Sequence, residues 1–327
     1  MRTFEWIDAT SVDEAAQLLA RSESNAVVVA KAAGLDLMDL MKEGIITPSR
    51  VINLKSIAGL DLIGFTEAGE LELGTLATLT QVETSPEIRV RYPALAAAAR
   101  HAATPQIRNA ATIGGNLLQR PRDWYFRNEP FYHTDIGLHI RDGENQYHAI
   151  FDNSRCAMVQ APTPATALAA YDARVELVGP NGRRRMVSLR EFFRPPDPHR
   201  DSDTVIERGE ILTRVIVPAT GPGTRSAYHK QTERDSYDWP ICDVAVVLRQ
   251  EGSTIDSASI VMGWVAPTPR RAVDSERLLA GQEITDDLAR AAARAAVADA
   301  TPLSKNAYKV DVLETVVRRT ILAAARA

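Results

Sequence analysis

Two glycine-bearing segments contain the residues best suited to hold a ligand. In the first, residues 29–37, an apolar run enters the small residues Ala32, Ala33 and Gly34, and a helix pattern follows. Small residues let backbone N–H groups approach a ligand closely, and a helix N-terminus favours an anion, so this segment could cradle a diphosphate. It lacks the three-glycine spacing of the dinucleotide fingerprint, and a plain strand–turn–helix connection is the simpler alternative.

The second segment places Gly114 and Gly115 between Thr112 and Asn116. Paired glycines allow a tight backbone, and two polar side chains then stand at its edge. An ordinary Gly–Gly–Asn turn accounts for the same residues when they are considered alone.

Cysteine and histidine add little further chemistry. Cys156 and Cys242 are too few for a disulfide framework or for the four thiolates of an iron–sulfur cluster. We therefore expect two inert thiols and a reducing, cytoplasmic location. His133, His139 and His148 are irregularly spaced, so a metal site is only the minor alternative and none is expected.

Composition narrows the class of protein and its partners. The chain has 327 residues, 45% of them hydrophobic, and this length predicts roughly two domains. Its formal net charge of −4 argues against nucleic acid, because phosphate binding needs a basic face. The first residues do not resemble a signal peptide, and no stretch approaches the ~20 apolar residues that span a bilayer. We expect neither nucleic acid nor a membrane as a partner.

Strand and helix patterns alternate near the N-terminus. Residues 27–30 and 51–54 predict buried strands, residues 36–42 predict a helix between them, and Ser11 begins a capping box before an earlier helix. Residues 1–55 therefore predict a small α/β lobe.

The remainder predicts strands and helices without internal repeats. Before residue 218 we expect a strand at 71–74, a second capping box from Thr80, a helix at 93–103, a strand at 211–217, and a long polar loop at 120–160.

Glycine and proline at residues 220–223 predict a domain boundary. Strand patterns at 244–248 and 258–262 are followed by helix patterns at 286–300 and 311–325. Strands followed by helices predict an α+β C-terminal domain.

A longer stretch is more specific than either glycine segment. Residues 104–122 read TPQIRNAATIGGNLLQRPR, and they resemble the FAD-binding subunit of the xanthine dehydrogenase, carbon monoxide dehydrogenase and aldehyde oxidoreductase family, the molybdenum hydroxylases. That family usually has Thr-Ile-Gly-Gly-Asn here and Ala-Gly-Gly-Thr-Asp-Leu-Leu in the first segment. The resemblance continues through residues 209–213, 228–230, 238–240, 263–269 and 301–309, so it spans nearly the whole chain.

The resemblance implies an α+β fold in two domains. Residues 1–218 would form a vanillyl-alcohol-oxidase (PCMH)-type FAD-binding domain with lobes 1–55 and 56–218. Residues 219–327 would form a smaller α+β domain of the carbon monoxide dehydrogenase flavoprotein type. FAD would be bound non-covalently, because no histidine or cysteine occupies a family attachment position.

The resemblance also implies roles for individual residues. Backbone N–H groups of the first segment would hold the two phosphates, and the second segment would lie beside the diphosphate and the ribityl chain. Leu212 matches an apolar residue near the flavin ring. Lys230 matches a lysine close to the flavin, where a cation favours the negatively charged reduced form; by itself it would be interpreted as a surface lysine. The expected cofactor-binding residues are Ala30, Lys31, Ala32, Ala33, Gly34, Leu35, Asp36, Leu37, Thr112, Ile113, Gly114, Gly115, Asn116, Leu212 and Lys230.

The chain departs from the family pattern at three places. Ala33 and Leu35 replace a glycine and a threonine of the first segment; because the backbone donors remain, these changes should at most weaken FAD binding and should not exclude it. Thr163 replaces an acid that contacts the cofactor. Asp123 stands where one branch of the family has the first cysteine of a [4Fe–4S] site, so no iron–sulfur cluster is expected in this chain.

Three functions are compatible with these residues. In the first, a [2Fe–2S] partner passes electrons through FAD to NAD⁺, oxygen or another acceptor, while a molybdopterin-containing large subunit hydroxylates the substrate; no catalytic side chain is then needed here. In the second, a stand-alone FAD-dependent oxidoreductase acts directly on a small molecule, with Tyr228, His229 or Glu233 as candidate bases. In the third, the chain is a structural subunit without FAD.

Overall fold

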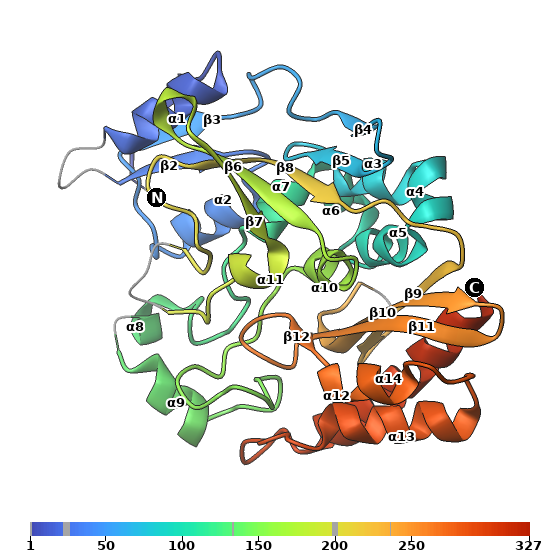
Figure 1. Cartoon of the computed structure of the whole chain (residues 1–327). Coiled ribbons are helices and arrows are strands. Elements are labelled where there is room, and N and C mark those ends of the chain that lie inside the picture. The colour runs from blue at the N-terminus through green and yellow to red at the C-terminus, as the bar shows by residue number, and fades with distance from the viewer. Residues whose placement is uncertain (1, 22–26, 133, 198–201, 236) are drawn as a thin grey trace.

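Three separate β-sheets organise the chain (Figure 1). The computed structural model describes residues 2–21, 27–132, 134–197, 202–235 and 237–327. In the part of the chain that is described, no helix combines the length and apolar character needed to cross a membrane.

The N-terminal sheet has three parallel strands in the order β1-β3-β2. Its elements are β1 (Glu5–Asp8), α1 (Val12–Ala20), β2 (Val28–Lys31), α2 (Leu35–Lys42) and β3 (Arg50–Asn53). Ser11 caps α1 by accepting from the Glu14 N–H at 3.1 Å, but the Glu14 carboxylate returns to the N–H of Thr10 instead of Ser11. The α/β character is confirmed, while β1 was missed because its sequence has no β-branched run.

The second sheet has five antiparallel strands in the order β4-β5-β8-β6-β7. The strands are β4 (Ile63–Phe65), β5 (Leu71–Gly74), β6 (Arg174–Val178), β7 (Arg184–Ser188) and β8 (Ile211–Val217). Apolar side chains of β5, β6 and β8 form the largest core cluster together with the alanine-rich helices α5 (Pro93–Arg100) and α10 (Thr163–Ala170). Alanine lets these helices pack close to the sheet without leaving voids.

Short helices connect the strands of this second sheet. They are α3 (Leu79–Thr84), α4 (Pro86–Arg91), α6 (Pro105–Ala110), α7 (Ile113–Leu117), the 3₁₀ turn η1 (Pro180–Gly182) and α11 (Leu189–Phe192). The capping box predicted from Thr80 is wrong. It starts at Thr78, whose hydroxyl accepts from the Gln81 N–H at 3.2 Å, while the Gln81 side chain accepts from the Thr78 N–H at 2.7 Å.

The middle segment, residues 120–160, is more ordered than the predicted polar loop. It contains α8 (Glu129–Tyr132) and α9 (Ile136–Asp142). Phe126, Ile140 and Met158 are buried in a small apolar cluster that also includes Leu40 of α2. The cluster was missed because its apolar residues follow no period and pack against Leu40, which lies far earlier in the chain.

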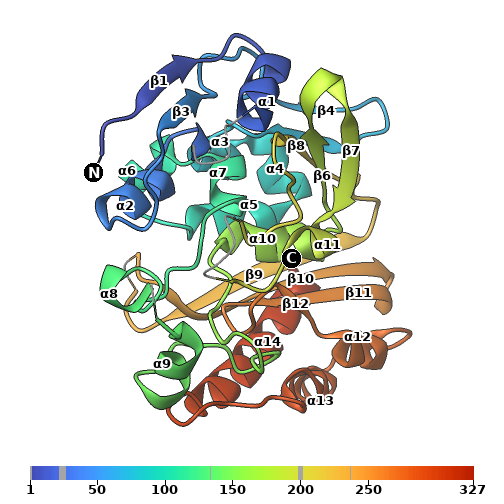
Figure 2. The same cartoon turned by 90° about the vertical axis from the view of Figure 1, so that its left-hand side faces the viewer.

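The C-terminal domain has a four-stranded antiparallel sheet in the order β12-β11-β10-β9. Its elements are β9 (Thr224–Thr232), β10 (Pro240–Glu251), β11 (Thr254–Gly263), β12 (Arg270–Arg271), α12 (Val273–Leu279), α13 (Asp286–Val297) and α14 (Tyr308–Arg326). The long strands lie between α5 and α10 on one side and α12–α14 on the other (Figures 1 and 2). The predicted strands and helices of this domain are confirmed, with different ends.

Lys309 ties this domain to the middle segment. Its side chain is fully buried, and Nζ donates to the carbonyl oxygens of Tyr147 and His148 at 3.0 Å each and of Trp264 at 2.7 Å. Asn306 adds a hydrogen bond from Nδ2 to the His148 carbonyl at 3.1 Å. Burial lowers the pKa of Lys309 to about 7, so the amine titrates near neutrality in the folded chain.

We predict that Lys309→Met lowers the free energy of unfolding by about 2–3 kcal/mol, because buried carbonyl groups lose their donor. Lys309 is largely neutral above pH 7 when folded but charged when unfolded, so it makes wild-type stability rise with pH above 7. In Lys309→Met, this rise of stability with pH should be absent. Urea unfolding from pH 6.5 to 9 measures both effects.

Lys305→Met is the matched control, since it breaks only the exposed Lys305–Glu144 pair and should cost less than about 1 kcal/mol. Equal losses in the two variants would contradict the role assigned to Lys309.

Candidate functional site

The structure brings the two glycine segments together. A Cβ atom added to Gly115 would lie 3.9 Å from the Cβ of Ala32. The carboxylate of Asp36, in the first turn of α2, accepts from the backbone N–H of Arg120, just beyond α7, at 2.9 Å. Segments about eighty residues apart in sequence therefore lie against each other, between the first sheet and the helices of the second.

The first segment presents an uncapped helix start. Gly34 precedes α2 with a φ of 81°, in the left-handed region that favours glycine, and no side chain caps the helix. The N–H groups of the first turn have no intrahelical acceptor, so they are available to an anion. The neighbouring Lys31 Nζ donates to the Ala32 carbonyl at 3.2 Å.

The two glycines of the second segment serve different purposes. The Gly114 N–H donates to the Thr75 carbonyl at 2.9 Å, and a Cβ there would lie 1.8 Å from the Thr75 hydroxyl oxygen, so the packing itself requires glycine. Gly115 is exposed, and its bare Cα faces the first segment. Thr112 begins α7 by accepting from the Gly115 N–H at 3.1 Å, while Ile113 is buried in the core.

Asn116 carries a polar atom without a partner. Its Oδ1 is buried and has no hydrogen-bond partner among the described residues. An unpaired buried acceptor costs about 1–3 kcal/mol, so a ligand that donated a hydrogen bond to this oxygen would remove that cost.

Two arginines and two carboxylates fix α2 against the middle segment. Asp36 pairs with Arg127 at 2.7 Å and Arg122 at 3.0 Å, and Asp39 pairs with the same guanidinium groups at 3.3 and 3.2 Å. The arginine side chains are only 11% and 19% exposed. Removal of one partner from such a poorly exposed group of charges would leave the others without that counter-ion, which is strongly destabilising.

Leu212 and Lys230 lie on other elements. Leu212 is buried in β8 as part of the large core. Lys230, in β9, is partly buried, and its Nζ donates to the carbonyl of His101 at the end of α5 at 2.8 Å. Burial lowers the pKa of Lys230. No hydrogen bond between described residues joins either side chain to the glycine segments.

The departures from the family pattern occupy distinct environments. Leu35 is the first residue of α2 with its side chain 42% exposed, and Thr163 is buried at the start of α10. Asp123 accepts from the N–H groups of Tyr125 and Phe126 at 2.9 Å each and contacts the His148 ring. It therefore shapes the turn that positions the arginines.

Both cysteine thiols remain protonated at neutral pH. Burial raises the pKa of Cys156 and of Cys242 to about 12. Within the described ranges, no three histidine, cysteine or acidic side chains gather as a metal site would require. His133 lies outside the described residues.

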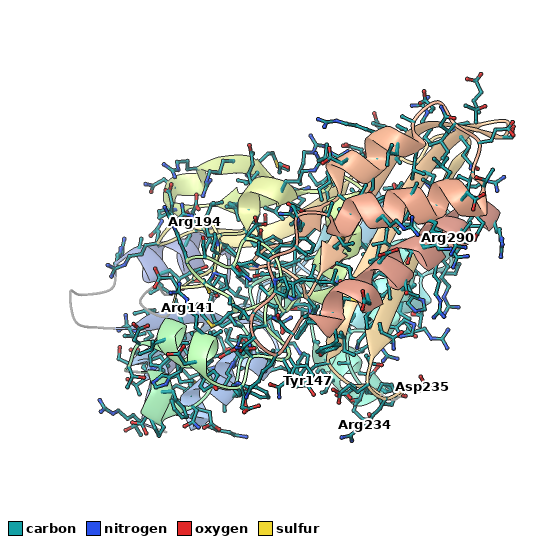
Figure 3. All side chains as sticks on the ribbon, turned by 90° about the horizontal axis from the view of Figure 1, so that it is seen from below. Arg141, Tyr147, Arg194, Arg234, Asp235 and Arg290 are labelled. Carbon is teal, nitrogen blue, oxygen red and sulfur yellow. The ribbon has the colours of Figure 1, made fainter. Side chains whose placement is uncertain are left out.

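The candidate bases of the stand-alone hypothesis have other partners. The Tyr228 hydroxyl donates to Asp243 at 2.8 Å, and burial raises its pKa well above the ordinary value. Burial lowers the pKa of His229, whose side chain lies on the opposite face of β9. Glu233 accepts from the Tyr147 hydroxyl at 2.6 Å, and Figure 3 shows Tyr147 beside the loop that carries Arg234 and Asp235.

Comparisons with known families define the class of protein. Residues 2–220 match the family described as FAD binding domain in molybdopterin dehydrogenase, and residues 227–324 match the CO dehydrogenase flavoprotein C-terminal domain. The chain belongs to the family of FAD-binding subunits of the molybdenum hydroxylases. The expected α+β fold and the resemblance are thereby confirmed.

Individual relatives cover almost the full chain. It is 32% identical over 303 residues to the FAD-binding subunit of an Escherichia coli aldehyde oxidoreductase, covering 90% of this chain and 91% of that one. It is 31% identical to the carbon monoxide dehydrogenase medium chain of Hydrogenophaga pseudoflava, covering 98% and 96%. A solved structure of carbon monoxide dehydrogenase from that organism superposes with a TM-score of 0.77 at 29% identity, covering 99% and 97%.

We predict that Asp36→Asn lowers the free energy of unfolding of the FAD-free chain by about 2–3 kcal/mol, because two partly buried guanidinium groups lose a charged partner. Urea titration measures this loss. Glu5→Gln, which removes an exposed pair with Arg50, is the matched control and should cost less than about 1 kcal/mol. A loss for Asp36→Asn no larger than for the control would contradict the prediction.

Proposed function

We propose that this chain is the electron-transfer subunit of a cytoplasmic molybdenum hydroxylase, with domains 1–218 and 219–327. A [2Fe–2S] partner would deliver electrons, a molybdopterin-containing partner would hydroxylate the substrate, and NAD⁺, oxygen or another molecule would accept the electrons. One observation supports the proposal most directly. The start of α2, which no side chain caps, lies close to the second glycine segment, and that segment contains the unpaired Asn116 oxygen.

FAD supplies one- and two-electron transfer when it is bound. The residues of this chain bind and orient it. Backbone N–H groups of residues 34–37 would hold the diphosphate, and Gly115 would leave room for close approach. The Asn116 side chain would make the hydrogen bond that it lacks in the chain alone.

Lys230 would tune the reduction potential of the flavin. A partly buried ammonium group favours a negatively charged reduced flavin, because a low local dielectric strengthens the attraction. No general base is needed for electron transfer. The hydrogen bonding of Tyr228 and Glu233 favours this proposal over a stand-alone oxidoreductase.

The test is expression of the full chain, followed by its absorbance spectrum and the mass of any released cofactor. The proposal expects a yellow protein that releases FAD and co-purifies with its two partners. A colourless chain that cannot be reconstituted with FAD would support the structural-subunit alternative. Substrate oxidation by the chain alone, without molybdenum, would support the stand-alone alternative.

We predict that Asn116→Ala weakens FAD binding about tenfold, equivalent to about 1.4 kcal/mol, because one hydrogen bond is lost. The stability of the FAD-free chain should not fall, because the substitution removes an unpaired buried acceptor. Quenching of flavin fluorescence measures the affinity, and urea unfolding measures the stability.

Asn109→Ala is the control, since this asparagine lies on α6 and bonds the Thr80 hydroxyl at 2.8 Å. It should leave FAD affinity unchanged. Unaltered affinity in Asn116→Ala would remove Asn116 from the cofactor site.

A further inference from the structure

Asp243 is a fully buried carboxylate that the proposed function leaves unused. It lies in β10 on the sheet face that packs against α10. It accepts hydrogen bonds from the Tyr228 hydroxyl at 2.8 Å and the Thr166 hydroxyl at 2.9 Å, and a third from the Gly263 N–H. Three donors converging on one buried carboxylate stabilise its ionised form.

The surroundings are shaped to admit this carboxylate. A Cβ added to Gly263 would lie 2.0 Å from an Asp243 carboxylate oxygen and 2.3 Å from the Thr166 hydroxyl oxygen. Glycine therefore leaves the space that the acid and its hydroxyl donor fill. An apolar side chain at position 243 would leave these three donors without their present acceptor.

Lys230 stands opposite this carboxylate. Asp243 pairs with Lys230 in the register of β9 and β10, and Tyr228 and Lys230 share one face of β9 because they are two residues apart. Burial lowers the pKa of Lys230, and attraction from Asp243 and Asp238 opposes that effect. The attraction from Asp243 crosses protein interior, where screening by water is weak.

We propose that Asp243 is a positioning residue that keeps Lys230 protonated, and that it thereby extends to higher pH the range in which Lys230 stabilises reduced flavin. The proposal rests on the proposed function in one respect, the placement of Lys230 beside the flavin. The coupling between the two side chains does not depend on the cofactor.

The ionisation of Asp243 sets a second, lower pH range over which its attraction for Lys230 changes. Burial raises the pKa of Asp243 to about 6, so the carboxylate is ionised above that pH and is neutral below it. The titratable and charged groups that face the pair are Tyr228 of β9, Asp238 of the β9–β10 connection and His101 at the end of α5, while Cys242 lies next to Asp243 in β10 with its side chain on the opposite face.

The first test follows Lys230 in the full FAD-free chain by NMR. Lysine labelled with ¹³C at Cε reports the protonation of each amine, and the Lys230 signal is identified by its loss in Lys230→Arg. In Asp243→Asn, the pH at which Lys230 loses its proton should fall by about one unit, because a nearby opposite charge is removed. Thr166→Val, which removes a hydrogen bond and no charge, should leave that pH nearly unchanged.

The wild-type chain offers a second measurement that needs no variant. The Lys230 signal should show a smaller inflection near pH 6 as Asp243 ionises. A folded Asp243→Asn chain with an unchanged Lys230 titration would overturn the proposal. If that variant does not fold, a wild-type signal without the inflection would overturn it.

The second test uses the FAD-loaded chain and measures the flavin midpoint potential between pH 5 and 10. The potential should change slope where Lys230 loses its proton, and this pH should be lower in Asp243→Asn than in wild type or Thr166→Val. A slope change at the same pH in both chains would overturn the link to the flavin. A chain that binds no FAD would refute the proposed function, while the NMR titration would still decide the coupling of Asp243 to Lys230.

Discussion

The geometry around the two glycine segments depends on one carboxylate, that of Asp36. It accepts from the backbone beyond α7 and pairs with two guanidinium groups of the middle segment, so it connects α2, α7 and residues 120–127. A carboxylate in the first turn of a helix would by itself repel a diphosphate. Arg122 and Arg127 offset that charge, so the same contacts that fix the backbone leave the helix start attractive to an anion.

The C-terminal domain contributes to the same region through the middle segment. Lys309 and Asn306 hold residues 147–148, and His148 contacts Asp123, which caps the turn before Arg127. A continuous set of buried polar contacts thus runs from α14 to the start of α2. These polar contacts add to an apolar interface, because the C-terminal sheet packs directly on α5 and α10 and its Ala245 and Val261 belong to the largest core cluster.

Local patterns in the sequence predicted much of the fold and picked out the two glycine segments that the structure brings together. The strand at 211–217 has the predicted bounds, because apolar residues stand on both sides of Thr213 and Arg214 and most of the strand is buried. Contacts between distant residues were not predictable. Thr78 and Thr80 both fit a capping pattern, but Glu83, the residue expected to complete the box from Thr80, pairs with the distant Arg108 instead. The unpaired Asn116 oxygen and the carboxylate pocket at Asp243 depend on side chains from several elements, and no local pattern carries that information.

Gly114 and Gly115 are constrained for different reasons, the first by the fold and the second mainly by the space next to the first glycine segment. Gly114 is required by its contact with Thr75 in any descendant that keeps this architecture, whether or not it binds FAD. Gly115 faces the other segment and is constrained only by what lies between them and by the Thr112 hydroxyl. If a descendant kept this fold but lost FAD, Gly114 would stay fixed by Thr75, and only the Thr112 hydroxyl would still limit the residue at position 115.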